Sequence, residues 1–183
     1  MNDFIGFPKI ARLKREVIVT EKIDGTNAQI RITDAGEFLI GSRNRWITPD
    51  NDNYGFARWA YENKEELMRL GIGAHFGEWW GQGIQRTYGM KEKRFSLFNV
   101  TRWNDDELRP KCCDVVPALY QGIFSTNAID ECVNKLREFG SIAAPGFMRP
   151  EGIVAFCTAN NICFKTTLEN DETPKSKNDV RED

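Results

Sequence analysis

A lysine stands between an apolar segment and an Asp-Gly turn near the start of the chain, in the stretch 20–27, TEKIDGTN. The flanking residues, 17–19 and 28–33, are rich in β-branched side chains and predict two strands joined by a short polar turn. If Lys22 is shielded from water and close to positive groups, it loses its proton more readily, and its neutral amine can attack an electrophile. The same pattern is typical of a hairpin tip with a solvated lysine. On its own the stretch favours the solvated lysine, so the nucleophile hypothesis depends on the rest of the chain.

Further polar residues stand at the ends of predicted strands or inside them, where side chains can converge on one site: Arg43, Glu78, Glu151 and Lys165. Glu78 is the most informative, because it lies in the aromatic-rich strand 75–80 and an unpaired buried carboxylate costs several kcal/mol. Arg43 is equally well explained as a surface residue, and Glu151 as a glutamate at a strand start. Only a fold that brings these residues to Lys22 would make them a site.

Short strands and two helices must position these residues. Apolar residues recur at helical spacing over 56–70, after Asp52 or Asn53 as the capping residue. A second apolar stripe over 129–136 predicts a helix that Gly140 ends. Strands on both sides of these helices predict an α+β domain, in which mostly antiparallel sheets are flanked by helices.

The length of the chain favours one folded domain. Its 183 residues are enough for one domain with a sizeable core and few for two. Residues 169–183 are polar and charged, so they cannot build a core and predict a disordered tail. We therefore expect a single domain over residues 1–168.

Charge and composition exclude several classes of protein. The formal net charge of −2 gives no general attraction to a polyanion, so a nucleic acid would need a local basic patch. The glycine-punctuated loop 81–93 and the basic segment 1–15 could supply it. The chain has no apolar run of about 18 residues and no apolar signal core, so we expect a cytoplasmic protein with no membrane span. The five scattered cysteines match no ordinary zinc spacing, and we expect them to be reduced.

Six segments, taken in order between residues 17 and 167, resemble the motifs of the covalent nucleotidyltransferases, the superfamily of ATP-dependent DNA and RNA ligases and mRNA capping enzymes. The third and fourth segments are very similar to those of the bacteriophage RNA ligase 2 family. One such motif is a weak signal, whereas six in order are a strong one. The segments are KIDGTN at 22–27, SRN at 42–44, FGEWWGQGIQ at 76–85, FSLFNV at 95–100, EGIV at 151–154 and FKT at 164–166.

The resemblance implies an ATP-grasp-like nucleotidyltransferase domain that acts as an ATP-dependent RNA ligase. Lys22 would attack the α-phosphate of ATP and carry AMP to a 5′-phosphate end, which a 3′-hydroxyl then seals. Phosphoryl transfer gains chiefly from positioning and charge neutralisation. The expected cofactors are therefore ATP and Mg²⁺ or Mn²⁺. The expected partners are RNA ends, in single strands or a nicked duplex that could contain DNA, and the protein would be a monomer active in RNA repair.

The resemblance gives the residues around the phosphates separate roles. Lys165 would supply a fixed cation at the α-phosphate, and its positive field would help to lower the pKa of Lys22. Glu151 would hold magnesium, directly or through water, as a hard oxygen ligand. Asn27 would orient the adenylate and the incoming end.

The resemblance also assigns residues to the nucleoside. Arg43 and Glu78 would contact the ribose hydroxyls. Phe98 would stack on adenine and leave Phe95, on the other face of the strand, for the core. Glu21 would accept a hydrogen bond from the adenine amine, although a solvated glutamate explains it nearly as well.

The last two motifs pose a geometric test. In a regular hairpin with the two-residue turn Asn160-Asn161, Lys165 pairs with Phe156 and points to the face opposite Glu151. Both side chains can face one nucleotide only if the loop has an odd length or one strand carries a bulge. We predict such an irregularity.

Two departures from the family pattern leave alternatives open. The last motif commonly has two lysines one residue apart, whereas here Lys165 is followed by Thr166 and Thr167. The second phosphate contact is then missing, or Thr167 or another lysine replaces it. Ligases of this superfamily carry a further C-terminal domain, whereas here the last motif is followed by the short polar segment 169–183. We therefore expect a lone nucleotidyltransferase domain. The alternatives are a DNA ligase-like nick sealer and a non-catalytic pseudo-ligase that binds ATP or nucleic-acid ends.

Overall fold

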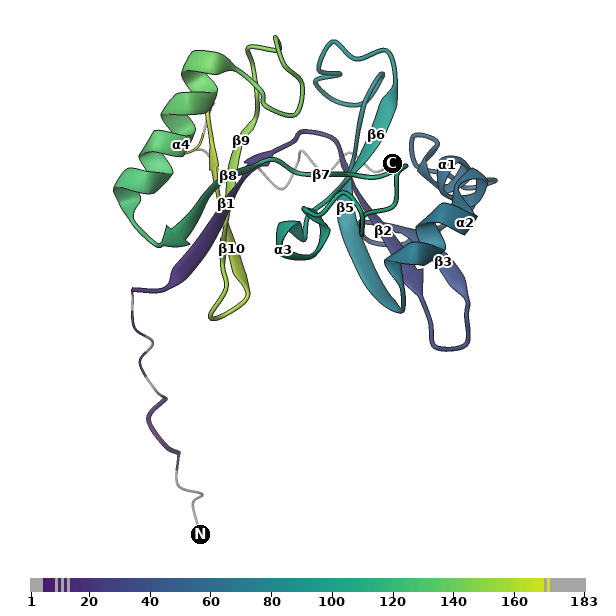
Figure 1. Cartoon of the computed structure of the whole chain (residues 1–183), viewed down its shortest axis with the longest axis horizontal. Helices are drawn as coiled ribbons and strands as arrows, with labels where there is room; N and C mark the ends of the chain where they lie inside the picture. Colours follow the sequence, from purple (N-terminus) through teal and green to yellow (C-terminus); the bar gives the residue numbers. More distant parts are fainter. Residues whose placement is uncertain (1–4, 9, 11, 13, 170, 172–183) are drawn as a thin grey trace.

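Two β-sheets lie side by side between helices in the computed structural model, which describes residues 5–8, 10, 12, 14–169 and 171 (Figure 1). The first sheet has the strand order β10-β9-β1-β8, and the second has the order β4-β3-β2-β5-β6-β7. Only the short pairing of β6 with β7 is parallel within these two described sheets. The predicted α+β class with mostly antiparallel sheets is confirmed. The predicted basic segment 1–15 and tail 169–183 fall largely outside the described residues.

The first sheet carries one long helix on its outer face. Its elements are β1 (Glu16–Lys22), β8 (Ala118–Ile123), α4 (Thr126–Phe139), β9 (Gly152–Cys157) and β10 (Ile162–Thr167). Val17 and Val19 of β1 pack with β9 and α4 in one apolar cluster. Because side chains alternate along a strand, Ile18 and Lys22 point to the opposite face. That face looks toward the second sheet, since Ile18 belongs to a cluster that contains Trp80 of β5.

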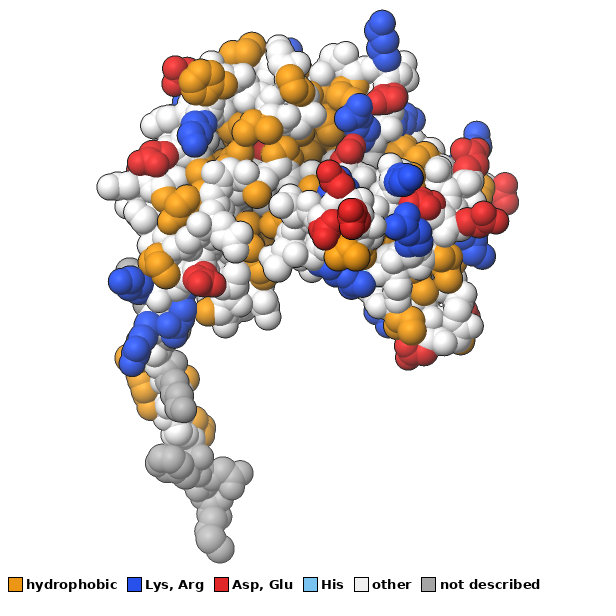
Figure 2. Space-filling model, viewed as in Figure 1, with side chains coloured by type: hydrophobic (Ala, Val, Ile, Leu, Met, Phe, Trp, Pro, Cys, Tyr) orange, Lys and Arg blue, Asp and Glu red, His pale blue; other side chains and the backbone are white. Residues whose placement is uncertain are grey.

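The second sheet buries its outer face under short helices. Its elements are β2 (Thr26–Ile32), β3 (Phe38–Ser42), β4 (Trp46–Ile47), α1 (Phe56–Glu62), α2 (Lys64–Leu67), the 3₁₀ helix η1 (Met68–Leu70), β5 (Gly73–Gly81), β6 (Lys93–Leu97), α3 (Val100–Trp103) and β7 (Asp114–Val115). Trp79 and Phe95 pack in the same cluster as Phe56 of α1. The next residue of β5, Trp80, faces the first sheet instead. Lys, Arg, Asp and Glu side chains intermingle on the surface over α1 and α2 (Figure 2).

The first predicted helix forms in three pieces rather than one. Residues 56–70 divide into α1, α2 and η1, with a break at Asn63. The predicted capping role of Asp52 is correct in substance, because its carboxylate accepts from the backbone N–H groups of Ala57 and Arg58 at 2.7 and 3.1 Å. The predicted second helix is the continuous α4, and Gly140 follows it with φ 79°. Side-chain periodicity thus located both helical regions but not the break.

The hairpin of β9 and β10 differs from the predicted one. Its loop covers residues 158–161, so Lys165 pairs with Val154 rather than with Phe156. The ladder from 152 to 157 runs without a shift in register, so the odd loop or bulge predicted for this hairpin is not found there. The prediction of a two-residue turn is wrong because Thr158 and Ala159 also belong to the turn.

The described helices include none that is long and apolar enough to cross a membrane. All five cysteines are free thiols in the structure, as expected. Burial raises the pKa of the Cys132 thiol.

Candidate functional site

The site is centred on an ion pair between Lys22 and Glu151. Lys22 is the last residue of β1, and its Nζ donates to Oε2 of Glu151 at 2.5 Å. The Glu151 side chain is 9% exposed and that of Lys22 is 25% exposed, so the pair is largely shielded from solvent. Two residues that lie 129 positions apart in the sequence therefore meet at one point.

Gly152 explains how the Glu151 carboxylate reaches this face. Lys22 pairs with Gly152, so a regular β9 would turn residue 151 toward α4, with Ile153. Gly152 has φ 154°, and a Cβ built there would lie 2.1 Å from the carbonyl oxygen of Thr166. Only glycine tolerates this backbone conformation at such close range. The break at Gly152 interrupts the alternation, and the Glu151 carboxylate contacts Lys22.

Lys165 lies on the same sheet face as Lys22. It pairs with Val154, which in turn pairs with Thr20 of β1, and paired residues of antiparallel strands share a face. β10 is two strands from β1, a lateral separation of roughly 10 Å, and Lys165 is exposed. The structure thus brings Lys165 to the face of the ion pair without direct contact.

Glu78 and Asn27 form a second polar pair beside the turn that follows Lys22. They are cross-strand partners in β5 and β2, and Asn27 Nδ2 donates to Glu78 Oε2 at 2.9 Å. Glu78 Oε1 accepts from the Gly25 backbone N–H at 3.0 Å. Glu78 is 7% exposed, and this burial raises its pKa to about 7, against the opposing effects of the Asn27 hydrogen bond and the Lys22 charge. The buried Glu78 carboxylate therefore has hydrogen-bond partners, as expected from the cost of burying an unpaired carboxylate.

The turn itself is fixed by close packing and by residues that the sequence reading did not assign to it. A Cβ at Gly25 would lie 2.4 Å from the carbonyl oxygen of Trp79, so the Asp-Gly step packs directly on β5. The backbone N–H of Asp24 donates to Tyr88 Oη at 2.8 Å. Arg86 Nε donates to Asp24 Oδ2 at 2.9 Å. Arg86 was predicted only as part of a basic loop, and nothing in the local sequence indicated Tyr88.

Glu21 lies on the other side of β1 from Lys22 and is only 1% exposed. Its carboxylate accepts from Ser141 Oγ at 2.5 Å and from the backbone N–H groups of Ile142 and Ala143 at 2.8 and 2.9 Å. Burial raises its pKa against these hydrogen bonds. Glu21 therefore ties the segment after α4 to β1, a contact that the sequence did not indicate.

Arg43 and Phe98 stand apart from the buried polar groups. Arg43 is exposed between β3 and β4, and in the described part of the chain it has no hydrogen bond to another predicted site residue. Phe98 follows β6 and is 42% exposed, whereas Phe95 is fully buried in the core, as predicted. An exposed aromatic ring is available for stacking in a way that Phe95 is not.

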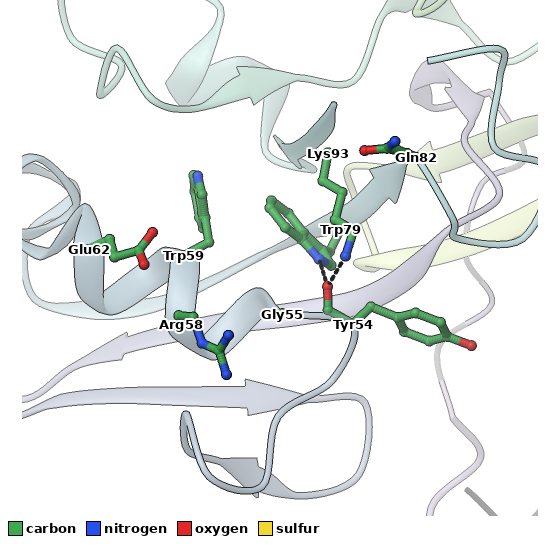
Figure 3. A pocket seen from close by; sticks show the side chains of 8 residues that line it. All are labelled: Tyr54, Gly55, Arg58, Trp59, Glu62, Trp79, Gln82 and Lys93. Atoms are coloured by element: carbon green, nitrogen blue, oxygen red, sulfur yellow. Dashed lines mark hydrogen bonds between the residues drawn. The ribbon is translucent and has the colours of Figure 1, made fainter. Parts of the chain in front are cut away.

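Two cavities lie at different distances along the fold from the turn after Lys22. One, of about 380 Å³, lies beside the turn after Lys22 and is lined by Asp24, Gln85, Arg86, Phe147 and Arg149. The other, of about 310 Å³, is lined by Tyr54, Gly55, Arg58, Trp59, Glu62, Trp79, Gln82 and Lys93 (Figure 3). There Trp79 Nε1 and Lys93 Nζ donate to the Tyr54 carbonyl at 3.1 and 2.6 Å. The second cavity lies on the α1 side of the sheet and contains none of the predicted site residues.

Comparison with solved structures shows the fold. A mutant of Naegleria gruberi RNA ligase with AMP and Mn matches with a TM-score of 0.58 and 21% identity over 84% of this chain and 49% of that chain. An apo mutant matches with a TM-score of 0.59 and 20% identity, over 84% and 49% of the two chains. Another mutant, with ATP and Mn, matches with a TM-score of 0.61 and 18% identity, over 92% and 58%. The chain spans about half the length of this similar protein.

Comparison with curated proteins gives no match. The model of the RNA ligase family matches residues 15–168, a segment that contains every predicted site residue. This match covers most of the chain and both sheets, and it shows that the chain belongs to the RNA ligase family.

Proposed function

We propose that this chain acts as the nucleotidyltransferase domain of an ATP-dependent RNA ligase, with Lys22 as its nucleophile. The observation that carries the proposal is the 2.5 Å contact between Lys22 Nζ and the largely buried Glu151 carboxylate. The alternative, a solvated lysine at a hairpin tip, does not explain why a largely buried carboxylate from a distant segment contacts Lys22. Glu78 adds a hydrogen-bond acceptor at the turn that follows Lys22. Lys165 adds a cation on the sheet face of Lys22.

The first step would transfer AMP from ATP to Lys22. The neutral amine attacks the α-phosphorus, a P–N bond forms, and the bond to the β-phosphate oxygen breaks with release of pyrophosphate. Lys22 must pass one proton to Glu151 or to water before the attack, because an ammonium has no free electron pair, and a second proton leaves the nitrogen as the P–N bond forms. The ion pair with Glu151 fixes the position of Nζ before ATP arrives, and positioning is a large part of the catalysis of phosphoryl transfer.

A divalent cation fits the donor atoms of the site, and Glu151 would hold it. The Glu151 carboxylate is a hard oxygen ligand at the reacting amine, and Mg²⁺ is commonly held by one or two carboxylates together with water and substrate phosphates. When bound, Mg²⁺ or Mn²⁺ neutralises charge on the phosphates. The similar Naegleria gruberi structures with AMP or ATP and Mn support this choice.

The nucleoside would contact the residues around Glu78. A carboxylate has about four acceptor positions, and the described donors to Glu78 occupy two of them, which leaves room for ribose hydroxyls. We assign Arg43 to the ribose as well, Phe98 to adenine stacking and Asn27 to orientation of the adenylate. Glu21 already accepts three hydrogen bonds, so at most one position remains for the adenine amine.

The phosphates would lie between Lys22 and β10. Lys165 shares the face of Lys22 and would supply the fixed cation at the α-phosphate. Thr167 pairs with Gly152, which pairs with Lys22, so Thr167 occupies the same row of this face. We propose that Thr167 replaces the second lysine of the last motif as a neutral donor, for which its hydroxyl would turn away from the Glu169 carbonyl oxygen, its acceptor at 2.9 Å. The loss of that charge motivates the competing hypothesis of a non-catalytic protein that binds ATP or nucleic-acid ends.

The later steps would act on RNA ends. An oxygen of a 5′-phosphate attacks the adenylate phosphorus and the P–N bond to Lys22 breaks; a 3′-hydroxyl then attacks the 5′-phosphate and AMP leaves. The basic loop 81–93 and segment 1–15 would hold phosphates, which makes sealing sensitive to salt. We extend the proposal to a monomeric cytoplasmic protein that acts in RNA repair and also accepts duplexes that contain DNA.

Incubation with ATP labelled on the α-phosphate tests the first step. The wild type and a Lys135→Ala control, altered on α4, should acquire a covalent label, and Lys22→Ala should acquire none. An unlabelled wild type would favour the non-catalytic hypothesis, and label that survives Lys22→Ala would exclude Lys22 as nucleophile. Nicked duplexes with RNA or DNA strands then distinguish an RNA ligase from a DNA ligase.

A further inference from the structure

The cavity of about 380 Å³ beside the turn after Lys22 contains two side chains to which no role has been given, Phe147 and Arg149. Its wall includes Phe147 and Arg149 from the segment between α4 and β9, and Gln85 and Arg86 from the loop after β5. We propose that this cavity binds the phosphate group that leaves from, or attacks, the α-phosphorus on the side opposite Lys22, and that Arg149 is its main ligand. This assignment rests on the proposed function and adds a phosphate subsite to it.

Two residues of the cavity wall are near neighbours of the ion pair along the chain. Asp24, in the cavity wall, stands two residues after Lys22. Arg149, also in the wall, stands two residues before Glu151, whose carboxylate is 2.5 Å from Lys22 Nζ. Two residues span at most about 7 Å between Cα atoms. The cavity wall thus contains a residue two positions from each member of the ion pair.

Arg86 is held in a fixed orientation in this wall. Its Nε donates to Asp24 Oδ2 at 2.9 Å, and its Nη1 donates to the carbonyl oxygen of Arg149 at 3.1 Å. Its Nη2 lies 3.8 Å from Oε2 of the exposed Glu169. Asp24 thus balances most of the charge of Arg86, and the second hydrogen bond fixes the backbone of Arg149 at the mouth of the cavity.

Unlike Arg86, Arg149 is a cation of the cavity wall whose charge is available to a ligand. Within the described residues its guanidinium has no ion pair and no hydrogen bond, and the residue is exposed. A guanidinium donates two parallel hydrogen bonds to phosphate oxygens, and a terminal phosphate carries a charge of about −1.5 to −2 at pH 7. The amide of Gln85 offers a further donor. The chemistry of the wall therefore suits a terminal phosphate better than an uncharged group.

The loop that carries Gln85 is held rigidly against the opposite wall. Gln85 and Tyr88 have φ angles of 42° and 51°, in the left-handed region. Tyr88 Oη accepts from the Asp24 N–H, and the Tyr88 ring packs on Phe147 with centroids 4.7 Å apart. The two walls of the cavity are thus joined by this aromatic contact and by the hydrogen bond from Arg86 to the Arg149 carbonyl oxygen.

In-line geometry gives this phosphate two sources. In phosphoryl transfer the attacking and leaving atoms lie on opposite sides of the phosphorus. Pyrophosphate therefore leaves from the side opposite Lys22 in the first step. The 5′-phosphate of RNA attacks from that same side when Lys22 is the leaving group in the second step. One subsite can hold the terminal phosphates of ATP and then the end of the RNA.

Arg149→Gln tests the assignment in the full chain, with Arg137→Gln on α4 as a control for the same change of charge. One assay measures KM for ATP in Lys22–AMP formation. The other measures, by fluorescence anisotropy, the binding of a short oligoribonucleotide with a 5′-phosphate and of the same strand with a 5′-hydroxyl. We expect Arg149→Gln to weaken at least one of these by about tenfold or more, Arg149→Lys to restore part of it, and the control to match the wild type.

The two assays separate the two sources. If Arg149→Gln raises only the KM for ATP, the subsite holds the phosphates of ATP. If it abolishes only the preference for the 5′-phosphate strand, the subsite holds the RNA end. Arg149→Gln within about twofold of the wild type in both assays overturns the subsite. A wild type that forms no Lys22–AMP refutes the proposed function instead. The anisotropy assay then decides the subsite by itself, and equal binding of the two strands by the wild type overturns it.

Discussion

The stability of a Glu78→Gln variant relative to the wild type should increase as the pH rises from 5 to 8. Glu78 is 7% exposed, and burial raises its pKa from 4.5 to about 7. Between these two values the unfolded chain has lost the proton and the folded chain retains it. The unfolded state therefore binds fewer protons, so the stability of the wild type falls as the pH rises through this interval and levels off above it. Glutamine cannot ionise and removes this dependence.

The interval from 4.5 to about 7 sets the size of the effect. At about 1.4 kcal/mol for each pH unit it corresponds to about 3 kcal/mol in full. Most of this, about 2 to 3 kcal/mol, falls between pH 5 and 8. Glutamine keeps one acceptor oxygen but loses one of the hydrogen bonds from Gly25 and Asn27, a cost of about 1 kcal/mol at every pH. The change with pH, rather than the absolute value, is therefore the quantity to measure.

Urea denaturation of the wild type, Glu78→Gln and an exposed Glu138→Gln control, at pH 5, 6, 7 and 8, gives this quantity. The free energy of unfolding of Glu78→Gln minus that of the wild type should increase by about 2 to 3 kcal/mol over this range. The same difference for Glu138→Gln should stay constant. Comparison with the wild type is needed because burial also raises the pKa of Glu21, which adds a slope of the same sign to both proteins. A difference for Glu78→Gln that stays flat or decreases with pH would refute a buried Glu78 carboxyl group that keeps its proton up to about pH 7.

Two further substitutions test the geometry around Lys22 by chemical denaturation. Gly152→Ala should destabilise the domain by about 3 kcal/mol or more, because its Cβ would lie 2.1 Å from the Thr166 carbonyl oxygen at φ 154°. Gly83→Ala, at φ 72° with nothing within 4 Å, should cost only about 1 kcal/mol, and equal costs would contradict the close approach at Gly152. Tyr88→Phe should lower the free energy of unfolding by about 1 kcal/mol through loss of the hydrogen bond from the Asp24 N–H. An unchanged midpoint would show that this bond contributes nothing.

The elements whose signal is local could be predicted from the sequence. The stripe Ile129, Cys132, Val133 and Leu136 located α4 because helical periodicity depends only on neighbours along the chain. Phe95 was placed in the core because side chains alternate along a strand. The six motif segments gave the candidate site residues for the same reason, since each is a short run of residues.

Contacts between distant segments could not be predicted in this way. Glu21 accepts from Ser141, 120 positions away, and neither residue has a neighbour that marks the contact. Tyr88 reaches Asp24 across 64 positions, from a loop whose left-handed residues carry no glycine signal at Gln85, Thr87 or Tyr88 itself. Such hydrogen bonds depend on the packing of the two sheets, which no local pattern encodes.

The relation between Lys165 and Glu151 shows where strand periodicity stops being a guide. Strict alternation put these residues on opposite faces and required an odd loop or a bulge in the hairpin. The ladder is regular, and Lys165 shares the face of Lys22 through it. Glu151 reaches Lys22 because the alternation ends at Gly152, whose φ of 154° is open to glycine alone at this close range. The glycine of the EGIV segment is therefore the residue that lets a strand-start carboxylate reach the amine, and the irregularity lies at the start of the strand rather than in its turn.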